Sequence, residues 1–452
     1  MKNTLRFTTL LLALAFCAFF DPSSVHAQDP MRPDPSMTDT PAPTYVIRNA
    51  RVVTVSGADI ENATVVISNG RISAVGASVT APSGAQEIDG RGLTVYPGMI
   101  DLGTSMGLGE ISAVGATQDT SELGDMNPNV ATIWSVNPHS SHINVTRVAG
   151  VTSALALPSG GIISGQAALI NLVGSSPREM AVAPQAALVV EFPRIGGGGG
   201  FAAFLQAQQG ITPDALAARD RRIDQLRQLL RDAEAYGRAQ DAYAKDPKNV
   251  ERPPSDLKLA ALVPYVRGER PVIFRAERDR EIRAVVRFAE EMKLKAVIIG
   301  GSEAWKTAQL LKERDVPVIL DSVLNMPLRE DDPYDSLYEN ASKLQAAGVR
   351  FCISTGDSGA HVRDLPFHAG MAAAYGLPKA EALKSVTLYP AQILGVADRL
   401  GSIEQGKVAN LVVTDGDLLE ARTSVRYLFI NGRQLPLVSR HTMLSDQFKD
   451  RK

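Results

Sequence analysis

The chain between residues 45 and 95 consists of short apolar, β-branched runs separated by turn residues. Asn69-Gly70 stands between two such runs, and this dipeptide is a strong short-range signal for a two-residue β-hairpin. The same pattern returns near the other end of the chain, where Asn431-Gly432 closes a similar run. We therefore predict that residues 45–95 and 405–440 pair into one composite β domain.

Between these segments, residues 96–404 alternate short apolar strands with helical patterns, which is typical of a parallel sheet with crossover helices. A helix is expected over residues 281–292, and Ser302 is expected to cap another. The predicted class is α/β, a (β/α)8 barrel of the TIM type with a small β-sandwich domain built from both ends of the chain. Eight candidate strands support the barrel: Met99–Asp101, Val151–Leu157, Ala167–Leu172, Ala187–Val190, Val272–Phe274, Ala296–Ile299, Val318–Leu320 and Phe351–Ser354.

One region, at about residues 195–255, interrupts this alternation. Five consecutive glycines, residues 196–200, precede a charged segment that reaches to about Lys245. Thr212-Pro213 is a cap and first-turn pair, so a long helix is expected to start there. Its charged composition indicates a solvated insertion on the barrel, and a lid or spacer and a partner-binding arm are both open as its role.

The first residues join a short basic region to an apolar run and a polar stretch that ends at Ala27. This is the pattern of a secretory signal peptide over residues 1–27, which predicts a periplasmic or secreted protein. Residues 28–44 are rich in Pro, Asp, Ser and Thr and are expected to form a disordered linker. No later segment has the roughly 18 consecutive apolar residues of a spanning helix, so no membrane span is expected.

The formal net charge is -2, with basic and acidic residues interspersed. This balance argues against nucleic acid or an anionic membrane as a partner. After the predicted signal is removed only Cys352 remains, which excludes an intramolecular disulfide. A small-molecule ligand or substrate is the expected partner, with a homo-oligomer or a paralogous partner chain left open.

The run from Tyr96 to Asp101, read with the β segment before it, resembles the start of the barrel in amidohydrolases of the imidazolonepropionase-like branch. The resemblance covers roughly residues 45–435 apart from the insertion, and it implies the composite domain of metal-dependent hydrolases and the hydrolysis of carbon–nitrogen bonds in non-peptide or cyclic amides. Asn410 stands where that family usually has Asp. The closing half agrees through a series of short motifs in order: Gly376-Leu377-Pro378, Ala382-Leu383, Thr387, Pro390-Ala391, Leu394-Gly395, Leu400-Gly401-Ser402-Ile403 and Gly406-Lys407-Val408-Ala409-Asn410-Leu411.

The resemblance also implies one or two divalent metal ions, which activate water and polarise the scissile carbonyl at the carboxyl end of the barrel. Glycine offers a metal no side chain, and a guanidinium is a permanent cation that repels it. We therefore expect a degenerate site, to which a divalent metal could bind only after rearrangement. The family's histidine positions correspond to residues without an imidazole: Gly103, Ser105, Arg275, and Gly300 or its neighbour Gly301.

The last-strand carboxylate of the family corresponds to Asp357. Together with His361, four residues later, it is a candidate for acid–base catalysis. Arg275 is expected to point into the barrel mouth, where it would pair with Asp357 or bind an anionic ligand. Asp101 and Glu110 lie at or just past predicted strand ends and are further ligand-binding candidates, although a turn-capping role is the alternative for Asp101.

Two other groupings and three functions stay open. His139 and His142 form either a metal-binding pair or hydrogen-bonded loop histidines. The functions are a hydrolase with a rearranged or metal-free site, a non-catalytic protein that binds a small ligand, and a scaffold for an active paralogue. An oxygen-rich site that would favour Mg, Mn or Ca could form from carboxylates on or just past predicted strand ends: Asp101, Glu110, Asp119, Glu122, Asp321 and Asp357.

Overall fold

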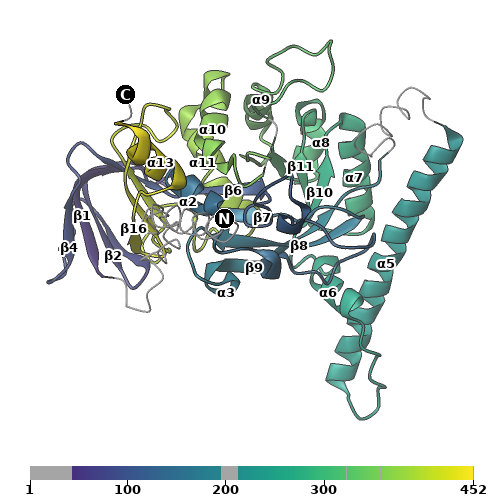
Figure 1. Ribbon diagram of the computed structural model, residues 1–452. Helices are drawn as coiled ribbons and strands as arrows, with labels where there is room; N and C mark the ends of the chain where they lie inside the picture. Colours follow the sequence, from purple (N-terminus) through teal and green to yellow (C-terminus); the bar gives the residue numbers. More distant parts are fainter. Residues whose placement is uncertain (1–42, 195–211, 322, 357, 451–452) are drawn as a thin grey trace, which may run out of the picture. The chain divides into compact units, whose positions relative to one another are not determined.

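The computed structural model describes residues 43–194, 212–321, 323–356 and 358–450. The predicted signal peptide, nearly all of the predicted linker, the five glycines and Asp357 lie outside the described residues. Two eight-stranded sheets and the helices around them form the described part (Figure 1). None of the described helices is long and apolar enough to cross a membrane.

The first sheet is built from both ends of the described chain, as predicted. Its order is β16-β15-β14-β5-β1-β2-β3, with β4 also paired to β1. The two ends join where β5 pairs antiparallel with β14, from Thr94 opposite Thr414 to Pro97 opposite Leu411. The strands are β1 (Tyr45–Val52), β2 (Ile60–Ser68), β3 (Arg71–Gly76), β4 (Gln86–Asp89), β5 (Thr94–Pro97), β14 (Leu411–Thr414), β15 (Val425–Ile430) and β16 (Arg433–Leu435).

Both predicted Asn-Gly turns have the left-handed backbone of a two-residue hairpin turn. The φ angles are 51° at Asn69 and 78° at Gly70, and 52° at Asn431 and 71° at Gly432. The two turns also lie against each other, because a Cβ on Gly432 would stand 2.6 Å from Gly70 Cα. The two ends of the chain therefore meet at a point where a glycine is required.

The second sheet is the predicted eight-stranded barrel, in the order β13-β12-β11-β10-β9-β8-β7-β6. Asp101 on β6 accepts hydrogen bonds from the side chains of Ser354 and Thr355, just past β13, and so links the two ends of this order. Apolar side chains such as Leu102, Ile273 and Ile319 fill the interior. The strands are β6 (Met99–Thr104), β7 (Val151–Ala156), β8 (Ile163–Asn171), β9 (Ala181–Val190), β10 (Val272–Ala276), β11 (Ala296–Gly300), β12 (Val318–Leu320) and β13 (Phe351–Ile353).

The expectation that all neighbouring strands run parallel is wrong at β8. This strand runs antiparallel to β7 and β9, whereas the other pairs in the ladder are parallel. Its connections, residues 157–162 and 172–180, are too short for a crossover, which takes a dozen or more residues. The second connection holds only the short helix α3 (Pro177–Met180), and 3-10 helix η4 (Thr132–Ser135) packs beside β8 and β9 instead.

Helices lie between the later strands of the barrel. Helix α7 matches the prediction for residues 281–292, but Ser302 does not cap the next helix, because its hydroxyl donates to Glu277 and 3-10 helix η5 begins at Ala304. Helix α12 contributes Ala391 and Ile393 to the apolar cluster of the barrel interior, and Leu394 just after the helix joins them. The remaining bounds are α2 (Ser141–Arg147), α6 (Leu257–Val266), α7 (Asp279–Glu291), η5 (Ala304–Thr307), α8 (Ala308–Glu313), α9 (Asn340–Ala347), η6 (Val362–Asp364), α10 (Leu365–Ala374), α11 (Lys379–Ser385), α12 (Leu388–Ile393) and α13 (Arg440–Phe448), with η3 (Gly115–Thr117) in the loop after β6.

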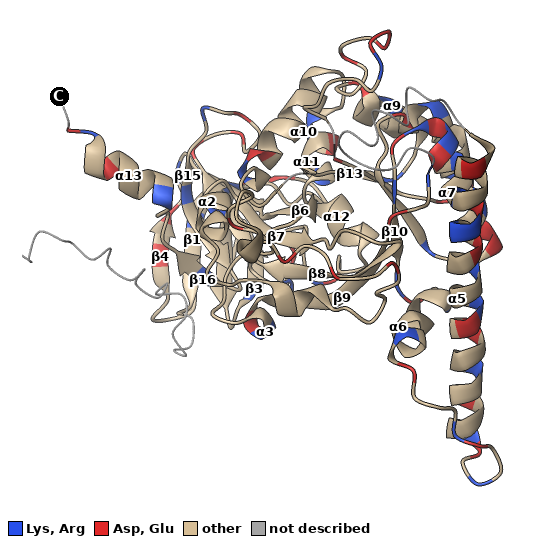
Figure 2. Cartoon of the chain, turned by 45° about the vertical axis from the view of Figure 1, so that its right-hand side comes forward, with Lys and Arg blue, Asp and Glu red and all other residues tan. Residues whose placement is uncertain are grey.

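The described part of the insertion is the single helix α5 (Pro213–Lys245), and Thr212 caps it as predicted by accepting a hydrogen bond from the Ala215 amide. One stripe, which includes Leu226 and Leu230, is buried, and Arg227 pairs with Glu291 on α7 at 2.7 Å. The rest of the helix carries acidic and basic residues in alternation (Figure 2).

Candidate active site at the carboxyl end of the barrel

Three charged side chains stand at the carboxyl ends of the barrel strands. Glu191 follows β9, Arg275 lies in β10 and Asp321 follows β12. In each strand, the residue two positions earlier belongs to the apolar interior of the barrel. Because side chains alternate along a strand, the three charged groups also point inward, one layer above this core.

Arg275 holds the two carboxylates together. Its Nε donates to Glu191 Oε1 and its Nη1 to Asp321 Oδ2, each at 3.2 Å. Burial by itself lowers the pKa of Arg275, but the charges of Glu191 and Asp321 outweigh it, so the pKa rises and the guanidinium stays charged. Nη2 has no hydrogen bond to any residue that the structure describes, which leaves donors for a ligand.

Asp321 is the most perturbed acid of this group. Its side chain is only 8% exposed. Burial and the negative charge of Glu277 raise its pKa to about 7, against the opposing effect of Arg275. A carboxyl group that titrates near neutral pH can both accept and donate a proton, and such groups gather at catalytic sites. We name Glu191, Arg275, Glu277 and Asp321 together the Arg275 cluster.

Neighbouring side chains fill the space at two of the predicted metal-ligand positions. A Cβ on Gly300, where φ is 102°, would stand 2.4 Å from Glu277 Oε1. The hydroxyl of Ser302 donates to the other Glu277 oxygen at 2.7 Å and fixes that carboxylate. A Cβ on Gly103 would stand 2.5 Å from the Ser354 hydroxyl oxygen. Neither position can take a larger side chain unless its neighbour moves.

These residues do not fit the metal ion that the resemblance implies. Gly103 and Gly300 have no ligand atom and no room for one unless Ser354 or Glu277 moves, and Arg275 brings a positive charge. Among the described residues, no group of three or more His, Cys, Asp or Glu side chains could hold a metal.

No hydrogen bond or ion pair joins the other described candidates, Asp101, Glu110 and His361, to the Arg275 cluster. Asp357 is outside the described residues, so its pairing with Arg275 stays a prediction, and the partners that the structure gives Arg275 are Glu191 and Asp321. His361 is 53% exposed and contacts Asp364 at 3.5 Å.

The hydrogen bonds of Asp101 indicate a structural role for this residue. It is fully buried and accepts hydrogen bonds from the Gly103 amide, the Ser354 hydroxyl and both the amide and hydroxyl of Thr355. With its oxygens used in this way, Asp101 links the first and last barrel strands, which supports the structural alternative over ligand binding.

The carboxylates of the loop after β6 do not assemble into a site with His139, in the same loop, or with His142, on α2. Glu110 accepts a weak hydrogen bond from the Asn137 side chain at 3.4 Å, and its carbonyl oxygen lies 3.2 Å from His142 Nε2. His139 is exposed, and so are the two other predicted carboxylates of this loop, Asp119 and Glu122. Of the predicted oxygen-rich set, the structure places Asp321 in the Arg275 cluster.

Sequence reasoning missed Glu191 and Glu277. Glu191 directly follows a predicted strand, and Glu277 stands two positions after Arg275, so both could have been found by counting inward positions beyond the strand ends. The family positions point to histidines, and neither carboxylate stands at one of these positions.

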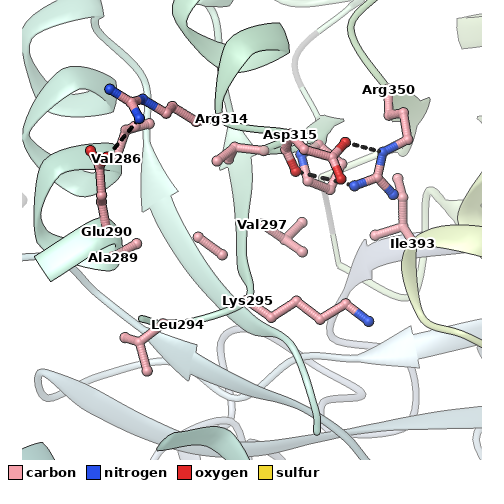
Figure 3. A pocket seen from close by; sticks show the side chains of 13 residues that line it. Val286, Ala289, Glu290, Leu294, Lys295, Val297, Arg314, Asp315, Arg350 and Ile393 are labelled. Carbon is pink, nitrogen blue, oxygen red and sulfur yellow. Dashed lines mark hydrogen bonds and ion pairs between the residues drawn. The ribbon is translucent and has the colours of Figure 1, made fainter. Parts of the chain in front are cut away.

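A hollow of about 250 Å³ lies at the opposite, amino end of the barrel (Figure 3). Val297 and Pro317, near the starts of β11 and β12, help to line it. Its arginines are neutralised, since Arg314 pairs with Glu290 at 2.7 Å and Arg350 with Asp315 at 2.8 Å. Because the hollow lies at the starts of the strands and the Arg275 cluster at their carboxyl ends, the two are separate.

Comparisons with known proteins agree with this architecture. The model of the amidohydrolase family matches residues 275–435. The chain is 26% identical to amidohydrolase tasK of Hapsidospora irregularis over 90% of its own length, and it spans about half, 45%, of that relative. A short stretch, 8% of the chain, is 57% identical to N-acetylglucosamine-6-phosphate deacetylase of Haemophilus influenzae and covers 10% of it. The crystal structure of an amidohydrolase from Thermotoga maritima is similar with a TM-score of 0.75 and 26% identity, over 86% of this chain and 99% of that one.

Proposed function

We propose that the chain is a member of the amidohydrolase superfamily and an exported hydrolase of carbon–nitrogen bonds in small molecules, non-peptide or cyclic amides; the family model over residues 275–435 and the similar amidohydrolase structure support this. The reaction would take place at the carboxyl end of the barrel, where the chemistry of barrel enzymes is found. The observation that carries the proposal is the inward-facing Asp321, whose pKa of about 7 suits proton transfer at neutral pH.

The chain's own residues suffice for an acid–base route. Asp321 in its ionised form accepts a proton from water as the water oxygen adds to the amide carbon. The protonated Asp321 then gives that proton to the leaving nitrogen as the carbon–nitrogen bond breaks, so the carboxylate is restored. Arg275 keeps one Asp321 oxygen in place through the 3.2 Å hydrogen bond and leaves the other for this exchange.

The test is turnover by the protein without its predicted signal peptide. A panel of lactams, hydantoins and N-acyl amino acids would be incubated in the presence of a chelator, and amine or acid release would be measured. We expect Asp321→Asn to lower the rate about 100-fold or more, the range for loss of a general acid–base group. Asp315→Asn, on the amino side of β12, is the matched control and should keep the rate.

A second function is favoured by a different observation, namely that Glu277 and Ser354 fill the space at Gly300 and Gly103. This arrangement is expected in a family member that has the barrel fold but does not catalyse hydrolysis. Such a protein would bind a small ligand or act as a scaffold for an active paralogue. Ligand-induced stabilisation without turnover across the same panel would select the binding function. A co-purifying related chain would select the scaffold.

A further inference from the structure

We infer that Arg275 supplies, from the chain itself, the fixed positive charge that a metal ion supplies in metal-dependent hydrolases, with Nη2 as the donor to a ligand oxygen. The part that concerns the ligand rests on the proposed function. The part that concerns the replacement of a metal by the guanidinium does not depend on the proposed function, and it can be tested without a substrate.

The first support is the convergence of carboxylates from different strands on one cation. Glu191 after β9 and Asp321 after β12 both direct an oxygen at Arg275, each at 3.2 Å. Inward-facing carboxylates from several strand ends are what a divalent ion requires of a barrel. Here the same arrangement is completed by a side chain from the strand between them in the barrel order.

The second support is the room that β11 leaves. To reach Asp321 after β12, the Arg275 side chain must cross β11, which lies between β10 and β12. The last inward side chain of that strand is Ile299, opposite Arg275, and Gly300 and Gly301 follow it, so β11 brings no side chain into the mouth beyond Ile299. The glycines that remove a metal ligand therefore also open the path for the guanidinium.

The third support is chemical. A guanidinium keeps its proton at any physiological pH, and it presents several N–H donors in one plane. Two of the three nitrogens of Arg275 bind the carboxylates, and Nη2 keeps its donors free of the residues that the structure describes. A cation held in this way can accept an oxygen of a ligand without any exchange of metal.

The experiment is a zinc titration of Arg275→His, in which an imidazole replaces the cation between the two carboxylates. We expect the wild type, purified without chelator or metal-binding tag, to retain less than about a tenth of an equivalent of Zn²⁺, and the variant to bind about one equivalent. Adding Glu191→Gln to the variant should abolish the binding. Arg350→His is the matched control, because Arg350 pairs with the single carboxylate Asp315.

The inference is overturned if the wild type binds about one equivalent of Zn²⁺ with Arg275 in place, or if folded Arg275→His binds none. Should Arg275→His fail to fold, Arg275→Ala gives a second measurement by thermal unfolding. Millimolar Zn²⁺ should raise the Tm of Arg275→Ala and leave the wild-type Tm unchanged, and an equal response of both proteins contradicts the replacement. Loss of amide hydrolysis would not affect these outcomes, so the two proposals fail separately.

Discussion

Both ends of the barrel carry arginine–carboxylate pairs, yet the two ends use them differently. At the amino end, Arg350 and Asp315 are 47% and 79% exposed, and each contributes one charge to an isolated pair. At the carboxyl end, Arg275 and Asp321 are 29% and 8% exposed, and Glu191 joins them. The same chemical groups therefore form a solvated pair at one end and a largely buried cluster at the other.

The difference matters because water screens the first pair more strongly than the second. An exposed ion pair contributes little to stability, whereas a buried charge that loses its partner is costly. Burial also lets neighbouring charges shift a pKa, as Glu277 does for Asp321. Substitutions at the two ends should therefore differ in size, and the following predictions test that difference in order of expected effect.

The largest effect is expected from Arg275→Met. Removal of the guanidinium leaves Glu191 and Asp321 facing each other in a largely buried site. We expect the free energy of unfolding at neutral pH to fall by about 3 kcal/mol, the low end for a broken buried pair because some solvent reaches Arg275. Urea unfolding followed by circular dichroism measures it. A loss below about 1 kcal/mol would mean that this cluster contributes no more to stability than the exposed pair at the amino end.

The next effect concerns the packed glycine at the carboxyl end. Gly103→Ala would put a methyl group 2.5 Å from the Ser354 hydroxyl oxygen, which itself binds Asp101. We expect a loss of about 1–3 kcal/mol from overpacking. Gly395→Ala, where no atom lies within 4 Å, controls for the methyl group itself, although its φ of 70° adds some backbone strain.

The double variant Gly103→Ala/Ser354→Ala separates contact from backbone effects. If the clash with the hydroxyl is the cause, the double variant loses less than the sum of the two single variants. Additive losses in urea unfolding would mean that Gly103 is needed for another reason.

The sequence was sufficient for the architecture because the fold rests on local patterns. The Asn-Gly turns at residues 69–70 and 431–432 and the apolar strand runs fix both sheets. The direction of β8 was missed, although its short connections, residues 157–162 and 172–180, contain the information. Loop length should therefore be read together with strand pattern.

The site was less predictable because its partners come together only in the folded chain. Arg275 was expected to reach Asp357 or an anion, but no spacing rule links it to Glu191, 84 positions away. Asn410 is a similar case. Its amide donates to Asn171 and accepts from the Asn431 backbone, whereas an ionised Asp could only accept, which explains why Asn suits this position.

A smaller effect, counted per pH unit, is expected in the pH dependence of stability at the carboxyl end. The pKa of Asp321 is about 7 in the folded protein, against an ordinary value of 3.8. Between about pH 4 and 7 the folded protein holds a proton that the unfolded chain has released, so stability decreases as pH rises, by at most about 1.4 kcal/mol per pH unit. Asp321→Asn should flatten this part of the stability curve from urea unfolding. An unchanged slope in the variant would assign the proton to another group.

The smallest effect is expected at the amino end, where Arg350→Gln removes the cation of the exposed pair. Water solvates Asp315, which is 79% exposed, after its partner is gone, so no charge is left buried. We expect the free energy of unfolding to change by about 0.5 kcal/mol, and the change to shrink further at 0.5 M salt, because salt screens exposed pairs. Urea unfolding at low and high salt, next to Arg275→Met under the same conditions, gives the comparison directly. A loss at Arg350 as large as that at Arg275 would show that burial of the charges does not distinguish the two ends.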